Sequence, residues 1–246
     1  MSRSASAITF DFHDTIAHCD EWFEIEVHRL PSAFFTWRER EVGAAADPEF
    51  ITEVDAAYRR FRKAIHRHGH ELPAERSLVA VAESMGMQLD PDEVDRGVKE
   101  IMRSAFESVA PVEGAIDTIH RLTAAGIPLG IVSSAVYHPF LIWTLDRFGL
   151  ARSFHSVTTS ASAGFYKSRP EIFWQTLLRI GAEPHRSAHI GDSLRFDVAG
   201  ARRAGMLTAW YNKDQSAGDA ASPELTVTSM RDAAPRLLTL LNGQWR

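Results

Sequence analysis

Short apolar segments rich in β-branched and aromatic residues recur along this 246-residue chain and alternate with helical patterns. The predicted strands are residues 7–12, 127–133, 154–158, 188–190, 207–211 and 225–227. Between them, Ala115, Ile119 and Leu122 fall at helical spacing before Gly126. Further helices are predicted over residues 140–148, 171–180 and 198–204. Strands that alternate with helices indicate an α/β fold with a parallel sheet and right-handed crossovers.

The stretch between residues 16 and 110 has a different character, because it shows helical periodicity and almost no strand signal. Tyr58 and Ile65, for example, belong to a clear helical stripe of apolar residues. About four helices are predicted here. The first begins near Trp22 and either ends before Pro31 or continues past it with a kink.

Composition limits the class of protein. Apolar residues make up 45% and charged residues 24% of the chain, which is ordinary for a globular protein. The net charge of −5 argues against a general nucleic-acid binder.

Cys19 is the only cysteine, which fits a reducing compartment. Residues 1–7 lack the apolar segment of a secretory signal, and no apolar run approaches bilayer length. We therefore expect a cytoplasmic protein without nucleic-acid or membrane partners. Residues 215–223 are predicted to form a surface loop.

Polar side chains follow the predicted strands, at the edge where parallel sheets bind their ligands. They are Asp11, Ser133, Ser134, Lys167, Asp192 and Asp197. Each alone is commonplace as a turn, cap or surface residue. Together, however, clustered carboxylates repel unless a cation such as Mg²⁺ lies between them. Lysine and serine side chains suit a phosphoryl group, so the combination can support in-line displacement by an aspartate nucleophile.

Four segments resemble the motifs of the haloacid dehalogenase (HAD) superfamily of hydrolases. They are Phe10-Asp11-Phe12-His13-Asp14-Thr15-Ile16, Ile131-Val132-Ser133, Lys167 with Arg169-Pro170-Glu171-Ile172-Phe173, and Ile190-Gly191-Asp192-Ser193 with Asp197. The resemblance covers nearly the whole chain. It implies a Rossmann-like, doubly wound core of residues 1–15 and 111–246, with a helical cap of the C1 type inserted as residues 16–110. Most members of the superfamily are Mg²⁺-dependent phosphatases that work through an aspartyl-phosphate.

The same resemblance implies a role for each motif residue. Asp11 would be the nucleophile that attacks phosphorus, and Lys167 would offset the negative charge on Asp11 and on the phosphoryl group. Ser133 would donate a hydrogen bond to a phosphoryl oxygen, with Thr15 and Ser134 as further substrate contacts.

The implied cofactor is Mg²⁺. The carboxylates of Asp11 and Asp192 and the backbone carbonyl of His13 would hold it, whereas Asp197 would act indirectly or orient Lys167. The expected function is that of a Mg²⁺-dependent phosphatase of a small phosphorylated metabolite, working as a monomer or homodimer.

His13 departs from the family pattern, because the phosphatases carry a second aspartate there as acid and base. Three alternatives follow. His13 itself does this work, since imidazole titrates near neutral pH. Asp14 substitutes from the next position. Alternatively, the chemistry differs, as in a haloacid dehalogenase, a phosphonate hydrolase, or a HAD-fold binding protein with little catalysis.

Residues 59–70 form a basic run on a predicted cap helix, with four arginines, one lysine and three histidines. Such a run could steer an anionic substrate, but a solvated helix face opposite Tyr58 and Ile65 is the favoured interpretation. A metal site at these histidines is not expected, because no cysteine or carboxylate stands at a familiar spacing.

Overall fold

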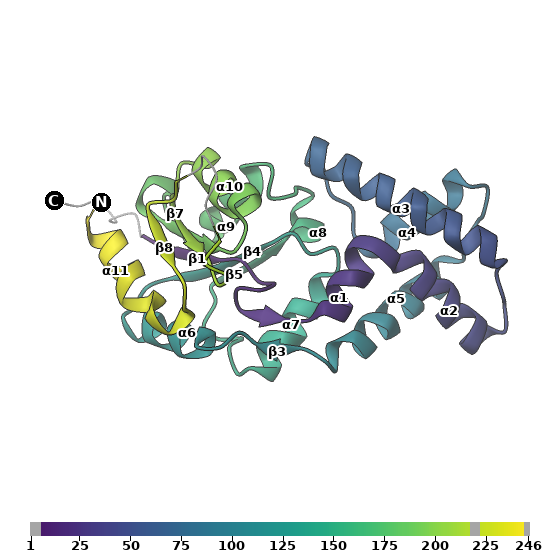
Figure 1. Cartoon of the computed structure of the whole chain (residues 1–246), viewed down its shortest axis with the longest axis horizontal. Helices are drawn as coiled ribbons and strands as arrows, with labels where there is room; N and C mark the ends of the chain where they lie inside the picture. Colours follow the sequence, from purple (N-terminus) through teal and green to yellow (C-terminus); the bar gives the residue numbers. More distant parts are fainter. Residues whose placement is uncertain (1–5, 217–221, 244–246) are drawn as a thin grey trace.

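The computed structural model describes residues 6–216 and 222–243 and contains a six-stranded parallel sheet (Figure 1). The strands are β1 (Ile8–Phe10), β4 (Leu129–Ser133), β5 (Ser156–Thr159), β6 (Ala188–Gly191), β7 (Leu207–Tyr211) and β8 (Leu225–Val227). Their order is β5-β4-β1-β6-β7-β8. Each predicted strand segment corresponds to one of them, so the predicted α/β fold is confirmed. The sheet extends from β1 in both directions, as in doubly wound folds, and ligands of such folds bind where the order reverses.

Helices cover both faces of this sheet, which explains why its four central strands, β4, β1, β6 and β7, are buried throughout. Helices α6 (Ala115–Ala124) and α11 (Ala233–Gly243) pack together on one face. Helix α9 (Glu171–Ile180) contacts β4 and β5, and its Phe173 joins a separate apolar cluster with Val132. The remaining helices of this part are α7 (His138–Arg147), α8 (Ser160–Ala163) and α10 (Ala199–Arg203). Figure 1 shows the sheet between these layers.

Most of the chain between β1 and α6 forms a helical body beside the sheet (Figure 1). It consists of α1 (Asp20–Glu24), a π-helical turn (Ile25–Arg29), α2 (Leu30–Val42), α3 (Pro48–His68), α4 (Ala74–Ser84) and α5 (Pro91–Phe106). A short antiparallel ribbon of β2 (Ala17–His18) and β3 (Ala110–Pro111) joins it to the sheet domain. The first predicted helix continues past Pro31, which lies in the first turn of α2, where a missing N–H costs no hydrogen bond.

Several elements differ from the sequence-based expectations. The two-residue strands β2 and β3 are too short to give a pattern, and α11 was not predicted although Leu237 and Leu241 are buried at helical spacing. Strand β5 begins two residues later than expected, because Phe154 packs edge-on against Phe10 before it. Most of the predicted loop at 215–223 lies outside the described residues. Among those that are described, no helix has both the length and the apolar character to cross a bilayer.

Candidate active site

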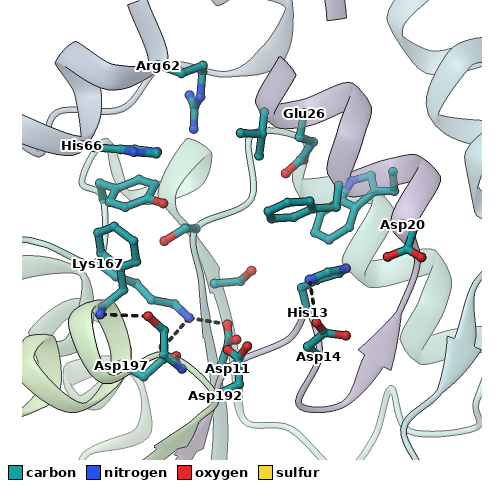
Figure 2. Close-up of a pocket in the computed structure, with 18 residues that line it drawn as sticks. Asp11, His13, Asp14, Asp20, Glu26, Arg62, His66, Lys167, Asp192 and Asp197 are labelled. Carbon is teal, nitrogen blue, oxygen red and sulfur yellow. Dashed lines mark hydrogen bonds and ion pairs between the residues drawn. The ribbon is translucent and has the colours of Figure 1, made fainter. Parts of the chain in front are cut away.

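A cavity of ≈ 400 Å³ lies at the carboxyl ends of β1, β4 and β6, between the sheet and the helical body (Figure 2). Its wall is made by Asp11, His13, Asp14, Asp20, Trp22, Phe23, Glu26, Val27, Arg62, His66, Ser133, Ser134, Tyr166, Lys167, Asp192, Ser193, Phe196 and Asp197. Figure 2 shows Arg62, His66 and Glu26 across the cavity from Asp11 and Asp192. The cavity therefore has a core side rich in carboxylates and a side supplied by the inserted helices.

Lys167 is the central cation of the core side. Its buried Nζ donates hydrogen bonds to Asp11 and, at 2.6 Å, to Asp197 Oδ1. Burial alone would lower the pKa of Lys167, but Asp11 and Asp197 raise it above its ordinary value. Lys167 is therefore charged at all physiological pH values. Burial, opposed by Lys167 and reinforced by Asp197 and Asp192, holds the pKa of Asp11 above its ordinary range.

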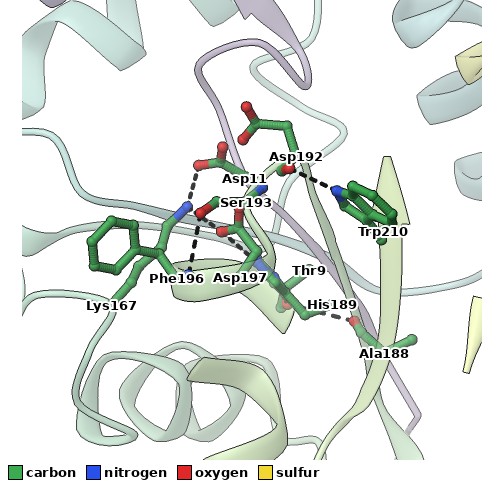
Figure 3. Close-up of polar contacts among 10 residues, drawn as sticks. All are labelled: Thr9, Asp11, Lys167, Ala188, His189, Asp192, Ser193, Phe196, Asp197 and Trp210. Atoms are coloured by element: carbon green, nitrogen blue, oxygen red, sulfur yellow. Dashed lines mark hydrogen bonds and ion pairs between the residues drawn. The ribbon is translucent and has the colours of Figure 1, made fainter. Parts of the chain in front are cut away.

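Asp197 is fixed from three directions (Figure 3). Besides Lys167, its Oδ1 lies 3.2 Å from His189 Nε2, and its Oδ2 accepts the backbone N–H of Ser193 at 2.9 Å. His189 Nδ1 in turn lies 2.8 Å from the hydroxyl of Thr9. Burial lowers the pKa of His189, so a neutral ring that donates from Nε2 and accepts at Nδ1 satisfies both contacts. This arrangement makes Asp197 an anchor for Lys167.

The backbone before Asp192 has to be glycine for a steric reason. A Cβ on Gly191 would lie 2.3 Å from Cγ of Asp197, well inside any tolerable contact. Trp210 Nε1 donates to the backbone carbonyl of Asp192 at 2.8 Å and holds that segment in place (Figure 3). The Gly-Asp pair of the sequence thus brings two carboxylates to one point of the sheet edge.

The carboxylates of Asp11, Asp192 and Asp197 fit a divalent cation. One oxygen from each lies within 4.8 Å of the others. These three carboxyl groups share the single ammonium group of Lys167, and burial and the charge of Asp197 raise the pKa of Asp192 to about 6. An all-oxygen donor set of this kind suits Mg²⁺. Because Asp197 is already committed to Lys167, His189 and Ser193, Asp11 and Asp192 are the side chains best placed to hold the ion.

His13 lies among aromatic rings at the edge of this cluster. Its ring stacks on Phe23 with centroids 4.8 Å apart and packs near Trp22 at 5.6 Å. Its Nε2 is buried and has no hydrogen-bond partner among the described residues. Burial lowers the pKa of His13, so the imidazole is neutral at pH 7 in the free protein.

Asp14, the neighbouring alternative for the acid and base, is engaged elsewhere. Its Oδ1 accepts from His18 Nδ1 at 2.5 Å, and its Oδ2 forms an ion pair with Lys213 at 2.9 Å. The residue has a φ of 58°, in the left-handed region, which aspartate tolerates better than most residues. Against the effect of burial, the hydrogen bonds from His18 and Lys213 lower the pKa of Asp14, which leaves this carboxylate a poor proton donor.

The two serines line the cavity, whereas Thr15 does not. Ser133, the last residue of β4, is buried in the cavity wall. Ser134 also lines the cavity, and its Oγ lacks a partner among the described residues. Thr15 is fully buried and does not line the cavity, because it sits in a tight turn where its N–H bonds to Phe12 at 3.3 Å. The structure thus gathers the predicted site residues other than Thr15.

Arg62 and His66 were not expected in the site, since the basic run was interpreted mainly as a solvated face. Arg62 is 3% exposed and forms a bidentate pair with Glu71, with N–O distances of 2.6 and 3.0 Å. His66 packs against Tyr166 with ring centroids 4.7 Å apart. The other arginines and the lysine of α3, namely Arg59, Arg60, Arg67 and Lys63, are exposed as expected. The position of Arg62 four residues after Tyr58 is the signal that could have revealed it.

Glu26 ties the inserted helices to the sheet domain. Its Oε1 accepts the backbone N–H groups of Val136 at 3.0 Å and Tyr137 at 3.1 Å, just beyond the serines that follow β4. Burial raises the pKa of Glu26 to about 8, although Arg62 acts in the opposite sense. Sequence reasoning did not identify Glu26, because its partners are backbone groups more than 100 positions away.

Comparisons with known proteins agree with this arrangement. The profile of the haloacid dehalogenase-like hydrolase family matches residues 5–205. Glyceraldehyde 3-phosphate phosphatase from Methanopyrus kandleri is 28% identical over 191 residues, which are 76% of this chain and 80% of that protein. Among solved structures, a 2-haloacid dehalogenase from Pseudomonas syringae has a TM-score of 0.69 at 22% identity and covers 98% of this chain and 100% of its own.

A HAD phosphatase from Thermococcus onnurineus has a TM-score of 0.63 at 21% identity and covers 97% of this chain and 98% of its own. At such identities these two structures show a common fold and do not separate dehalogenase from phosphatase. The family profile, in contrast, spans most of the chain and every polar segment from Asp11 to Asp197. The chain is therefore a member of the haloacid dehalogenase-like hydrolase family.

Proposed function

We propose that this hydrolase is a Mg²⁺-dependent phosphatase of small phosphorylated metabolites that works through an aspartyl-phosphate on Asp11. The observation that carries the proposal is the cluster in which Lys167 bridges Asp11 and Asp197 beside Asp192. Such a cluster retains negative charge for a divalent cation, which the hydrolysis of a phosphate ester uses and the displacement of a halide does not need.

The first step breaks the ester bond. A carboxylate oxygen of Asp11 attacks phosphorus, the bond from phosphorus to the ester oxygen breaks, and the leaving oxygen takes a proton from His13. Lys167 and Ser133 stabilise the charge on the phosphoryl oxygens. When bound, Mg²⁺ supplies further positive charge at this point. His13 is neutral in the free protein, so we expect the negative charge of the bound phosphate to raise its pKa and favour the protonated form.

The second step restores the enzyme. Water attacks phosphorus and gives a proton to His13, the bond from phosphorus to Asp11 breaks, and inorganic phosphate leaves. The water thereby returns to His13 the proton that His13 gave to the leaving group. Asp197 acts as a positioning residue, because it holds the amine of Lys167 without touching the phosphoryl group.

Residues 16–110 would serve as the cap that closes over the substrate and excludes water. Trp22, Phe23 and Val27 give this side of the cavity apolar surface, and a cavity of ≈ 400 Å³ suits a small molecule. We place the enzyme in the cytoplasm, with a small phosphorylated metabolite as its ligand, acting as a monomer or homodimer. The Methanopyrus kandleri relative makes glyceraldehyde 3-phosphate the first compound to test.

The experiment is a panel of phosphorylated metabolites assayed for phosphate release, with Mg²⁺ and with a chelator, using wild type and Asp11→Asn. A matched control is Asp117→Asn, because Asp117 is exposed on α6 and does not line the cavity. We expect Mg²⁺-dependent release that Asp11→Asn abolishes and Asp117→Asn retains. Release that continues in Asp11→Asn would exclude the proposed nucleophile.

A dehalogenase or phosphonate hydrolase is the second candidate, because His13 stands where the phosphatases carry an aspartate. His13 stacks on an aromatic ring, and burial lowers its pKa. If His13 therefore does not protonate a leaving group, this second candidate is favoured. The same panel includes a 2-haloacid without added metal and a phosphonate with Mg²⁺. Halide release that needs no metal, with no phosphate release from any ester, would support the dehalogenase instead.

A further inference from the structure

We propose that His13, His18 and Asp20 form a second metal site, separate from the oxygen-only cluster and suited to a borderline transition ion such as Zn²⁺. One ligand atom from each of the three residues lies within 4.8 Å of the others. His18 Nε2 lies 3.4 Å from Asp20 Oδ2, and the rings of His13 and His18 stack with centroids 5.9 Å apart. Binding of an ion would draw the three donors closer together, to the spacing of a zinc coordination shell.

Asp14 orients His18 toward the proposed site. His18 Nδ1 donates to Asp14 Oδ1 at 2.5 Å, which places Nε2 3.4 Å from Asp20 Oδ2, where either a proton or a metal ion on Nε2 satisfies both groups. Lys213 fixes the other oxygen of Asp14 at 2.9 Å. An outer carboxylate that orients a ligating histidine in this way is the usual support of zinc sites.

His13 also offers an unpaired nitrogen to the proposed site. His13 Nε2 is buried and unpaired among the described residues, which is costly for a polar atom unless something fills the position. The donor set of two imidazoles and one carboxylate leaves a coordination position open to water, as in catalytic zinc sites. Such nitrogen ligands select Zn²⁺ over Mg²⁺, whereas Asp11 and Asp192 offer oxygen alone.

The two sites meet at His13, and this has a consequence that rests on the proposed phosphatase function. A metal ion bound to the imidazole of His13 occupies the electron pair that the proton transfers require. Zn²⁺ should therefore inhibit hydrolysis even when Mg²⁺ is saturating. The site lies at the exposed edge of the cavity, since the Asp20 side chain is 82% exposed, so the ion can enter from solvent.

The test measures binding and inhibition separately. Zn²⁺ is titrated calorimetrically into the full chain with excess Mg²⁺ and no substrate, and Co²⁺ absorption gives a spectroscopic check of nitrogen ligation. The variants are His18→Gln and Asp20→Asn, with His120→Gln as the matched control, because His120 is exposed on α6. Asp20→Asn changes an exposed side chain and so tests the site even if His18→Gln unfolds.

We expect one saturable Zn²⁺ per chain, weakened at least about tenfold in His18→Gln and Asp20→Asn and unchanged in His120→Gln. Inhibition by Zn²⁺, taken relative to each variant's own activity, should weaken in parallel. Zn²⁺ binding that is absent in wild type, or equally tight in both variants, would overturn the site. Because binding is measured without substrate, a chain that binds Zn²⁺ as described but hydrolyses no phosphate would refute the phosphatase and leave the site standing.

Discussion

The side chain of Glu26 accepts the backbone N–H of Val136 at 3.0 Å, and so joins the inserted helices to the loop that follows Ser133 and Ser134. Three backbone hydrogen bonds also join the inserted segment to the sheet part, from Ala74 to Val136 and from Tyr166 to Gly69 at 2.9 Å, and from Glu71 to Gly164 at 3.0 Å. The contact of Glu26 differs from these in carrying a titratable group. The position of the loop that would bind phosphate is thereby coupled to the position of the inserted helices.

Glu26→Gln should remove a pH-dependent part of the stability. Glu26 has a pKa of about 8 in the folded chain against an ordinary value of 4.5, so its protonated form favours folding. Stability from this group is complete below about pH 4.5 and is lost as the pH rises toward 8. Glutamine keeps the accepting oxygen and has no proton to lose.

Urea unfolding of wild type and Glu26→Gln at pH 5 and pH 8 measures this difference. We expect the free energy of unfolding to fall less in the variant between these two pH values. Glu21→Gln, at an exposed position of α1, is the control and should follow wild type. If the free energy of unfolding depends on pH in the same way in Glu26→Gln and wild type, the raised pKa of Glu26 is contradicted.

Lys167→Met should affect stability and activity together. It leaves the carboxylates of Asp11 and Asp197 buried without their cation, which costs about 3–5 kcal/mol of unfolding free energy. Loss of its charge beside the phosphoryl group lowers turnover by about 10² or more. Denaturation in chelator and a phosphatase assay check both values, and added Mg²⁺ should restore part of the stability. Lys63→Met, exposed on α3, should change neither.

His13→Ala and Asp14→Asn separate the two candidates for the acid and base. With a substrate whose leaving group is poor, His13→Ala should lower turnover by about 10² or more, and the deficit should shrink with an activated aryl phosphate. Asp14→Asn should have the smaller effect, because His18 and Lys213 already hold that carboxylate. The reverse ranking, measured on the same two substrates, would assign the role to Asp14.

Gly191→Ala should disturb the carboxylate cluster without removing any functional group. The new methyl group would lie 2.3 Å from Asp197 Cγ, so Asp197 or the strand end has to move. We expect a loss of about 1–3 kcal/mol in stability and at least about tenfold in turnover. Gly243→Ala is the control, since a Cβ there meets nothing within 4 Å. Full activity in Gly191→Ala would show that the position of Asp197 matters little.

The strands and the carboxylates at their ends were predictable because both are local features of the sequence. Asp11 and Asp192 directly follow buried strands, and parallel strands bring such positions to one edge. The residues that the inserted helices contribute to the cavity were not predictable to the same degree. Glu26 acts on backbone groups of a distant loop, and Arg62 faces inward only because α3 packs its Tyr58 side against the π-helical turn.

Thr15 shows the limit of assigning roles by motif alone. It directly follows the left-handed turn at Asp14, and that turn buries its side chain away from the cavity. The contacts of Asp197 with His189 and Ser193 were equally unforeseen, because these residues reach it only once β6 and the following helical turn are folded.

The most direct test of the account is to trap the covalent intermediate. Wild type is mixed with a substrate labelled in its phosphoryl group, quenched in acid during turnover and digested for peptide mapping. The account predicts label on the peptide that contains Asp11, sensitive to hydroxylamine as an acyl phosphate is, and no label in Asp11→Asn. Label on any other residue, or turnover without any labelled protein at the shortest quench times, would contradict it.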